Sequence, residues 1–227
     1  MILNLSTVFK HRLWFHPLLF IGGLGFSVNT IASPLFTGLM SQDIFIDEPV
    51  ADSCTVLAPD IEYNYPQLSA HLFQRHAPTA LPSLSQTVQV VCSAPVDALF
   101  LTVETDPQSA SLADQDPTHF GLGTVNQQGL LGYYQVTLDN AAVDGSSVLL
   151  YQTDDPSHIS PPLASLKLKP IAFHGWTLDG RIPVKGQQYS VRLTVSPTLN
   201  SLRETQGPLV NGGELNGSLV LAFPFGI

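Results

Sequence analysis

The sequence has few charged side chains: aspartate, glutamate, lysine and arginine make up 12% of its 227 residues. Nine lysines and arginines stand against eighteen aspartates and glutamates, which gives a formal net charge of −9. A chain so poor in basic residues lacks the positive surface that binds phosphate backbones, and this argues against a nucleic-acid-binding protein. Low charge together with a positive mean hydropathy also argues against a disordered chain.

The sequence also lacks the motifs of common catalytic and metal sites. It has no Gly-x-Ser-x-Gly nucleophile elbow, and the glycine-rich segment 120–123 has no Lys-Ser/Thr pair to bind a phosphate. For that segment we prefer a tight bend with Phe120 and Leu122 packed inward. The histidines after residue 32 are scattered, and the acidic loop 105–118 lacks the pattern of an EF-hand. We therefore predict a protein that is not an enzyme and has no metal or other cofactor.

Long apolar runs are missing except near the N-terminus. There an apolar run, Leu18 to Val28, follows the basic residues Lys10-His11-Arg12, and Thr30 and Ala32 supply the small residues of a cleavage site. This order is typical of a secretory signal peptide, whereas a transmembrane helix needs about 20 apolar residues. We therefore predict a signal peptide at 1–32 and export of the mature chain. An uncleaved membrane anchor is the alternative.

Cysteine is scarce as well, with two residues, Cys54 and Cys92, both after the predicted signal. An even number of cysteines in an exported chain predicts a disulfide. Two cysteines alone cannot supply the ligands of a usual structural zinc site. A pair of buried free thiols is the alternative interpretation.

Proline and glycine, with 18 and 17 residues, are spread along the chain and favour short strands joined by turns over long helices. Patterns of apolar residues predict strands at 44–46, 54–57, 61–65, 87–92, 132–138, 147–153, 166–168, 188–196 and 217–227, and a more continuously apolar strand at 98–104. Asp144-Gly145 and Asp179-Gly180 predict tight turns. The sequence shows no amphipathic helix, internal repeat or interior linker. We predict one all-β domain at 44–227, an antiparallel β-sandwich, preceded by a short extension at 33–43.

The last predicted strand, Gly217 to Ile227, is the most apolar. Side chains alternate across a strand, so one face of this segment carries Leu219, Leu221, Phe223, Phe225 and Ile227. Such a strand is prone to aggregation unless another strand pairs with it. Its partner could come from its own sheet, from another chain or from an assembly partner.

Several short sequence blocks occur in an order that resembles one protein family. They are Ser53-Cys54-Thr55, Ile61-Glu62-Tyr63, Thr87 to Pro95, 120–123, Gly132-Tyr133-Tyr134, Val143-Asp144-Gly145 and Leu215 to Ser218. In order and spacing, the chain resembles exported bacterial fimbrial-subunit-like proteins, a pilin-like domain family of unknown function. The resemblance covers most of the mature chain. It departs from the family pattern at Asn64, where glycine is usual, and at Gly226, where pilins commonly have tyrosine.

This resemblance implies an immunoglobulin-like, pilin-type sandwich that is incomplete because one strand is missing. A periplasmic chaperone would fill the resulting apolar groove first, and the N-terminal extension of a neighbouring subunit would fill it later, both by strand addition. The assembly strand beside the groove would consist of Leu219, Leu221, Phe223 and Phe225. The donor residues of the extension would be Leu35, Thr37 and Leu39.

We therefore expect a structural or accessory subunit of a fimbria, assembled by the chaperone–usher pathway through donor-strand exchange and supporting cell adhesion. Its partners would be the chaperone, an outer-membrane usher and other fimbrial subunits, first in the periplasm and then at the cell surface. One alternative is a single-domain carbohydrate-binding adhesin with a glycan receptor, in which Trp176 stacks on a sugar; core packing would also explain this ring. Another is a self-contained periplasmic β-sandwich whose strand 217–227 completes its own sheet.

Overall fold

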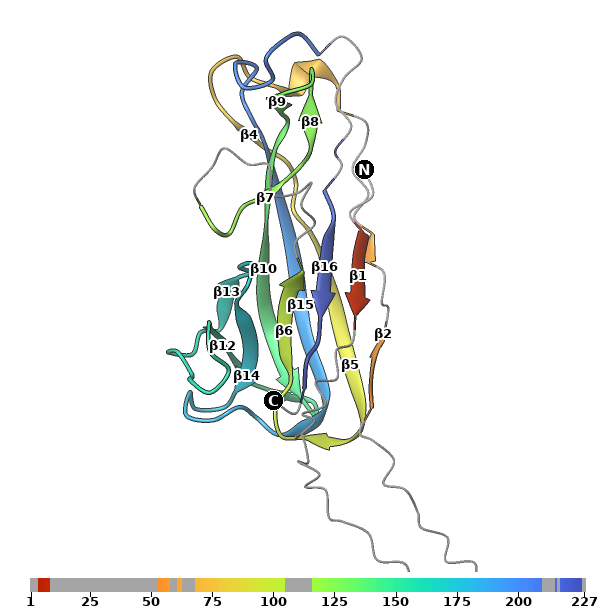
Figure 1. Ribbon diagram of the computed structural model, residues 1–227, viewed down its shortest axis with the longest axis vertical. Coiled ribbons are helices and arrows are strands. Elements are labelled where there is room, and N and C mark those ends of the chain that lie inside the picture. The colour runs from red at the N-terminus through yellow and green to blue at the C-terminus, as the bar shows by residue number, and fades with distance from the viewer. Residues whose placement is uncertain are drawn as a thin grey trace, which may run out of the picture. The chain divides into compact units, whose positions relative to one another are not determined.

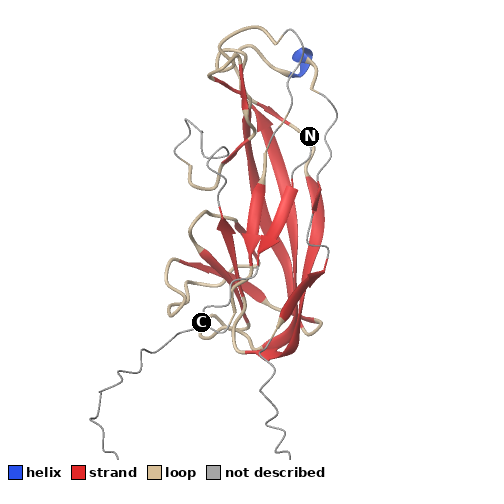
Figure 2. Cartoon of the chain, turned by 45° about the vertical axis from the view of Figure 1, so that its right-hand side comes forward, coloured by secondary structure: helices blue, strands red, loops and turns tan. Residues whose placement is uncertain are grey.

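The protein is seen here as a computed structural model (Figure 1), which describes residues 4–8, 53–57, 61–62, 68–104, 116–209, 215 and 217–225. Nearly all regular structure in these residues is β-strand. The one helical element among them is a 3₁₀ turn, η1 (Ala70–Leu72), drawn in blue in Figure 2. Two sheets pack against each other and share one hydrophobic core, which confirms the predicted all-β sandwich.

Three long strands form the centre of the larger sheet: β5 (Leu84–Val96), β10 (Gly132–Val143) and β15 (Gly186–Leu199). Strand β15 lies between β10 and β5 and pairs antiparallel with both, as Figure 1 shows. Short strands extend this sheet: β2 (Cys54–Leu57), β4 (Thr79–Ala80), β7 (Phe120–Gly121), β11 (Ser146–Ser147) and β13 (Ser165–Lys167). All pairings in the larger sheet are antiparallel, as the sequence predicts.

The second sheet contains, in spatial order, β12 (Leu149–Thr153), β14 (Phe173–Thr177), β6 (Phe100–Glu104), β16 (Leu219–Ala222), β1 (Asn4–Val8) and β3 (Ile61–Glu62). Its pairings are antiparallel except that between β16 and β1, which is parallel. A separate small hairpin is formed by β8 (Thr124–Val125) and β9 (Gly129–Leu130).

Buried and partly exposed residues alternate strictly along β15 from Tyr189 onward, which shows which of its faces lies against the core. Its buried side chains are Tyr189, Val191, Leu193 and Val195, and the residues between them are partly exposed. Figure 1 shows β15 lying along β10. The outward Arg192 of β15 makes a bidentate ion pair with Asp139 of β10, at 2.6 and 3.0 Å. The cleanest period-two pattern in the sequence therefore corresponds to the central strand of the larger sheet.

A β-bulge in β10 explains why this strand runs beyond the predicted end at residue 138. The pairing with β15 shifts register between Asp139 and Ala142, and Asn140 has a φ of +49°. The buried residues of β10 accordingly have even numbers up to Leu138 and odd numbers from Ala141 onward. Because the bulge inserts one extra residue, both halves of β10 face the core.

The two sheets are also joined by polar contacts of aromatic side chains. Trp176 of β14 packs edge-to-face on Tyr189 of β15, with ring centroids 5.6 Å apart. Its indole Nε1 donates a hydrogen bond of 3.2 Å to the carbonyl oxygen of Ser190. The hydroxyl of Tyr134 donates a 3.0 Å hydrogen bond to the carbonyl oxygen of Ser218, just before β16. These bonds satisfy polar atoms that the sandwich buries.

The predicted disulfide between Cys54 and Cys92 is confirmed. The two residues lie directly opposite each other in β2 and β5. Strand β2 has only four residues, so the covalent bond fixes a short edge strand to the long strand beside it.

Replacement of both cysteines by alanine should lower the free energy of unfolding by about 4 kcal/mol, because the disulfide closes a loop with a sequence separation of 38 residues. Urea denaturation of the full chain measures this loss, and reductant should give the same loss in the unsubstituted chain. A loss below about 1 kcal/mol would contradict the prediction.

The terminal strand is shorter than predicted. Strand β16 ends at Ala222, and the chain continues to a single antiparallel bridge between Phe225 and Leu99. Pro224 has no amide hydrogen to donate to a ladder, although its carbonyl oxygen accepts a 2.9 Å hydrogen bond from the amide of Phe100. The predicted strand at 44–46, the extension at 33–43 with Leu35, Thr37 and Leu39, and the loop 105–115 lie outside the described residues.

His174 is fully buried in β14 and bridges two segments of the backbone. Its Nδ1 lies 3.0 Å from the carbonyl oxygen of Leu101, and its Nε2 accepts a 3.2 Å hydrogen bond from the amide of Lys169. Both contacts suit a neutral ring that carries its proton on Nδ1. Burial, which disfavours the charged form, lowers the pKa of His174 from its usual 6.5 to about 4.

The protein should lose about 3 kcal/mol of stability through His174 between pH 7 and pH 4. In this range the unfolded chain takes up a proton at His174 below pH 6.5, whereas the folded chain does not until about pH 4, so stability falls with pH. Urea denaturation at both pH values should show a smaller difference for His174→Gln. The exposed His76→Gln is the matched control, and an unchanged pH dependence in His174→Gln would sink the prediction.

Candidate strand-accepting site

The four residues predicted to form the assembly strand lie together on the core side of the second sheet. Leu219, Leu221 and Phe223 are at most 1% exposed, and Phe225 is 8% exposed. One edge of β16 pairs with β6, with Leu221 opposite Val103. This apolar stripe is thus buried in the sandwich core and held by hydrogen bonds along one edge.

The other edge of β16 pairs with β1, whose residues belong to the predicted signal peptide. Leu5 lies opposite Leu219 and Thr7 opposite Leu221, with the two strands parallel. The far edge of β1 pairs antiparallel with β3, where Leu5 lies opposite Ile61. Figure 1 shows β1 beside β16 on this side of the sheet. Within the described part of the chain, no other strand lies between β16 and β3.

Removal of residues 1–32 would therefore leave a gap one strand wide. Neighbouring strands lie about 4.8 Å apart, so β16 and β3 would be separated by roughly 10 Å across the vacant position. Backbone N–H and C=O groups along the free edge of β16 would then lack partners. Sequence reasoning predicted the apolar stripe but missed β1, because residues 4–8 lie in a segment whose composition is that of a signal peptide.

The two walls of this gap, β16 and β3, also determine how a new strand would pair in each of its two possible orientations. Strand β1 is parallel to β16 and antiparallel to β3, so the two walls run in opposite directions. Any entering strand must be parallel to one wall and antiparallel to the other. Each orientation gives one parallel and one antiparallel ladder, and the two kinds of ladder differ only modestly in stability, so the walls favour neither orientation strongly.

Both ends of β16 are anchored to other parts of the sandwich. At its start, the buried Tyr134 donates to the carbonyl oxygen of Ser218. Beyond its end, Pro224 accepts a hydrogen bond from Phe100. Strand β16 is thus held at both ends and along its β6 edge by contacts that do not involve β1.

Trp176, the residue predicted for a possible sugar site, is 2% exposed and packs in the core. Tyr134 and Tyr151 are fully buried, while Tyr133 is partly exposed and stacks on His119, with ring centroids 3.8 Å apart. Burial raises the pKa of Tyr151 to about 12, and its hydroxyl has no hydrogen-bond partner among the described residues. A ring buried as deeply as Trp176 offers no open face for a sugar to stack on.

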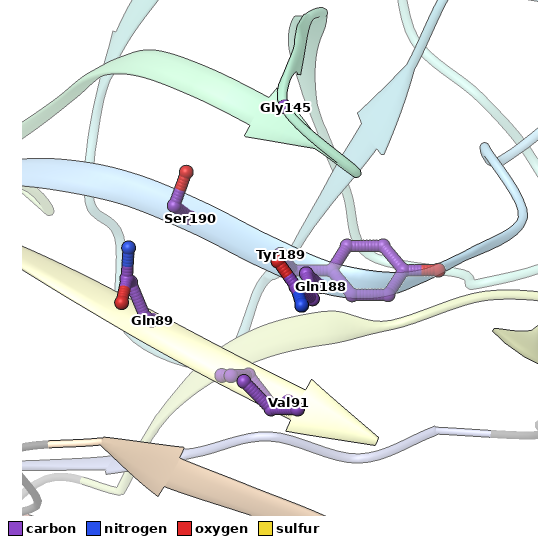
Figure 3. A pocket seen from close by; sticks show the side chains of 7 residues that line it. Gln89, Val91, Gly145, Gln188, Tyr189 and Ser190 are labelled. Atoms are coloured by element: carbon purple, nitrogen blue, oxygen red, sulfur yellow. The ribbon is translucent and has the colours of Figure 1, made fainter. Parts of the chain in front are cut away.

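A small hollow lies where the β10–β11 turn meets strands β5 and β15 (Figure 3). Its volume is about 130 Å³, below the roughly 300–1,000 Å³ of most small-molecule sites. The hollow is lined by Gln89, Val90, Val91, Gly145, Gln188, Tyr189 and Ser190. Its size makes it a poor candidate for a ligand pocket.

Two turns of sequence Asp-Pro-Ser/Thr-His share one local structure that sequence reasoning missed, although the repeated spacing is visible at 116–119 and 155–158. Asp116 accepts hydrogen bonds from the amide and hydroxyl of Thr118 at 2.8 and 2.7 Å. Asp155 accepts the same pair from Ser157 at 3.0 and 2.7 Å. The Ser157 bonds, with a further one from His158, lower the pKa of Asp155 to about 2. Local hydrogen bonds of this kind are typical of aspartate-initiated turns, and the first turn also contacts β10, where His119 stacks on Tyr133.

No protein-family model matches the chain, and no curated protein matches its sequence. The described residues contain no cluster of three or more histidine, cysteine, aspartate or glutamate side chains that could hold a metal ion. No helix in the described ranges is long and apolar enough to cross a membrane. We take the edge of β16 that β1 occupies as the candidate functional site.

Proposed function

We propose that the mature protein is a structural or accessory subunit of a bacterial surface fimbria and accepts a strand from another polypeptide. The observation that carries this proposal is the position of β1. A segment of the predicted signal peptide is the one described strand between β16 and β3. Once it is removed, the sandwich has an open apolar position of the kind that strand addition fills.

The energetic need for a partner follows from the residues beside the open position. Leu219 and Leu221 are fully buried when the sheet is closed. Full burial of each leucine side chain contributes about 1.5–3 kcal/mol, and an unpaired apolar edge is prone to aggregation. A chain with this edge open needs a protecting strand as it folds, which is the role proposed for a periplasmic chaperone. An outer-membrane usher and other fimbrial subunits would then complete assembly at the cell surface.

The sequence of the extension supports its proposed role as donor in a neighbouring subunit. Residues 35–39 have the order Leu-x-Thr-x-Leu, and residues 5–9 have the order Leu-x-Thr-x-Phe. Leu5 and Thr7 lie opposite Leu219 and Leu221. Leu35 and Thr37 of a donor would take the same two positions. The donor pattern also reads the same from either end, so it suits either orientation in the gap.

A synthetic peptide of residues 33–43 should bind the mature chain, residues 33–227, and raise its midpoint of thermal unfolding. At a peptide concentration one hundred times the Kd, binding would stabilise the chain by about 2.7 kcal/mol. Calorimetry measures the shift, and size-exclusion chromatography should show fewer aggregates. The matched control is the same peptide with Thr37→Pro, which removes one backbone donor.

The proposal is wrong if the mature chain is monomeric and stable without a peptide and if neither peptide nor a cognate chaperone changes this. The second candidate is a self-contained sandwich that keeps β1 in place. One observation supports that candidate: the sheet is already closed when residues 4–8 are present. Mass spectrometry of the exported protein separates the two, because a self-contained sandwich closed by β1 must retain those residues.

A further inference from the structure

We propose that the signal peptide blocks the strand-accepting site of the precursor with its own residues 4–8, so that signal removal opens the site. This inference concerns the regulation of the gap between β16 and β3 and rests on the function proposed above. The unprocessed chain would then be unable to accept a strand from another molecule. It would become able to do so when the signal peptide is cleaved, which the sequence predicts after Ala32.

The block is complete at the level of the backbone. Four residues of β1, Leu5 to Val8, are in register with Leu219–Ala222 of β16. The opposite edge of β1 pairs with both residues of β3, Asn4 opposite Glu62 and Leu5 opposite Ile61. A strand that pairs with both walls uses the hydrogen-bonding edges that a chaperone or donor strand needs, so two occupants exclude each other.

The covalent connection explains why cleavage would release this block. In the precursor, residues 9–53 connect β1 to β2, and the predicted cleavage site lies within that connection. A connected strand competes as an intramolecular partner, with an effective concentration that reaches the millimolar range for suitable linkers. After cleavage, β1 must bind by its own affinity, and a free five-residue strand is easily displaced.

The composition of β1 also suits an occupant that is later replaced. Its sequence is Asn-Leu-Ser-Thr-Val, with three polar residues among five. The proposed donor segment, residues 35–39, contains Leu35, Phe36 and Leu39 and one polar side chain, Thr37. In the shared register the donor places Leu35 and Thr37 where β1 has Leu5 and Thr7, so exchange after cleavage keeps the same residue types opposite β16.

The test compares binding of a fluorescent peptide of residues 33–43 to the oxidised precursor and to the mature chain. Fluorescence anisotropy should give a Kd at least tenfold higher for the precursor. Thr7→Pro in β1 should return the Kd of the precursor to that of the mature chain, because proline disrupts the strand. Asn29→Pro, in the signal peptide but outside β1, is the matched control and should leave the block intact.

Equal affinity of the precursor and the mature chain for the peptide would overturn this inference and leave the proposed function standing. Absence of peptide binding to the mature chain would instead count against the proposed function. In that case hydrogen–deuterium exchange of residues 217–225 decides the inference. Exchange at least tenfold faster in the Thr7→Pro precursor than in the unsubstituted precursor supports the block, and equal exchange rates overturn it.

Discussion

Backbone pairing along the edge of β16 that faces β1 is the interaction on which the organisation of the second sheet depends. Strand β16 carries buried leucines and is fixed to β6, yet its other edge is joined to β3 only through β1 in the described structure. A four-residue strand cannot leave such an edge open at low cost, because its polar backbone groups and apolar side chains both need cover. The identity of the strand that covers it therefore determines whether the protein is self-contained or an assembly subunit.

The larger sheet supplies the rigid support that makes this edge a template. Its long central strands pack against the second sheet through Tyr189 and Trp176, and Tyr134 reaches across to the backbone before β16. The disulfide holds the short edge strand β2 on β5. None of these contacts involves β1, so they can maintain the position of β16 when the strand beside it is exchanged.

Much of the sandwich could be predicted because half-buried strands impose a two-residue period. The segments 188–196 and 132–138 correspond to β15 and β10, and the sequence places the disulfide as well. The bulge at Asn140 could not be predicted, since no glycine or proline marks it and only tertiary packing reveals the change in parity. Strand length at the C-terminus was overestimated because Pro224 follows a segment that alternates well.

The candidate site was predictable only in part. Alternation identified Leu219 to Phe225 as an apolar stripe, because this signal is local. The partner of that stripe could not be read from the sequence, since Leu5 and Leu219 are far apart in the chain and parallel pairing has no local sequence signature. Burial of Trp176 likewise depends on Tyr189 in the opposite sheet, a contact that no neighbouring residue indicates.

The most direct test is an experimental structure of the mature chain, residues 33–227, alone or with a peptide of residues 33–43. We predict that β16 pairs with β6 on one edge and that its other edge is either open or paired with a strand from a different molecule. A structure in which another segment of the same mature chain pairs with that edge and closes the sheet onto β3 would contradict the account.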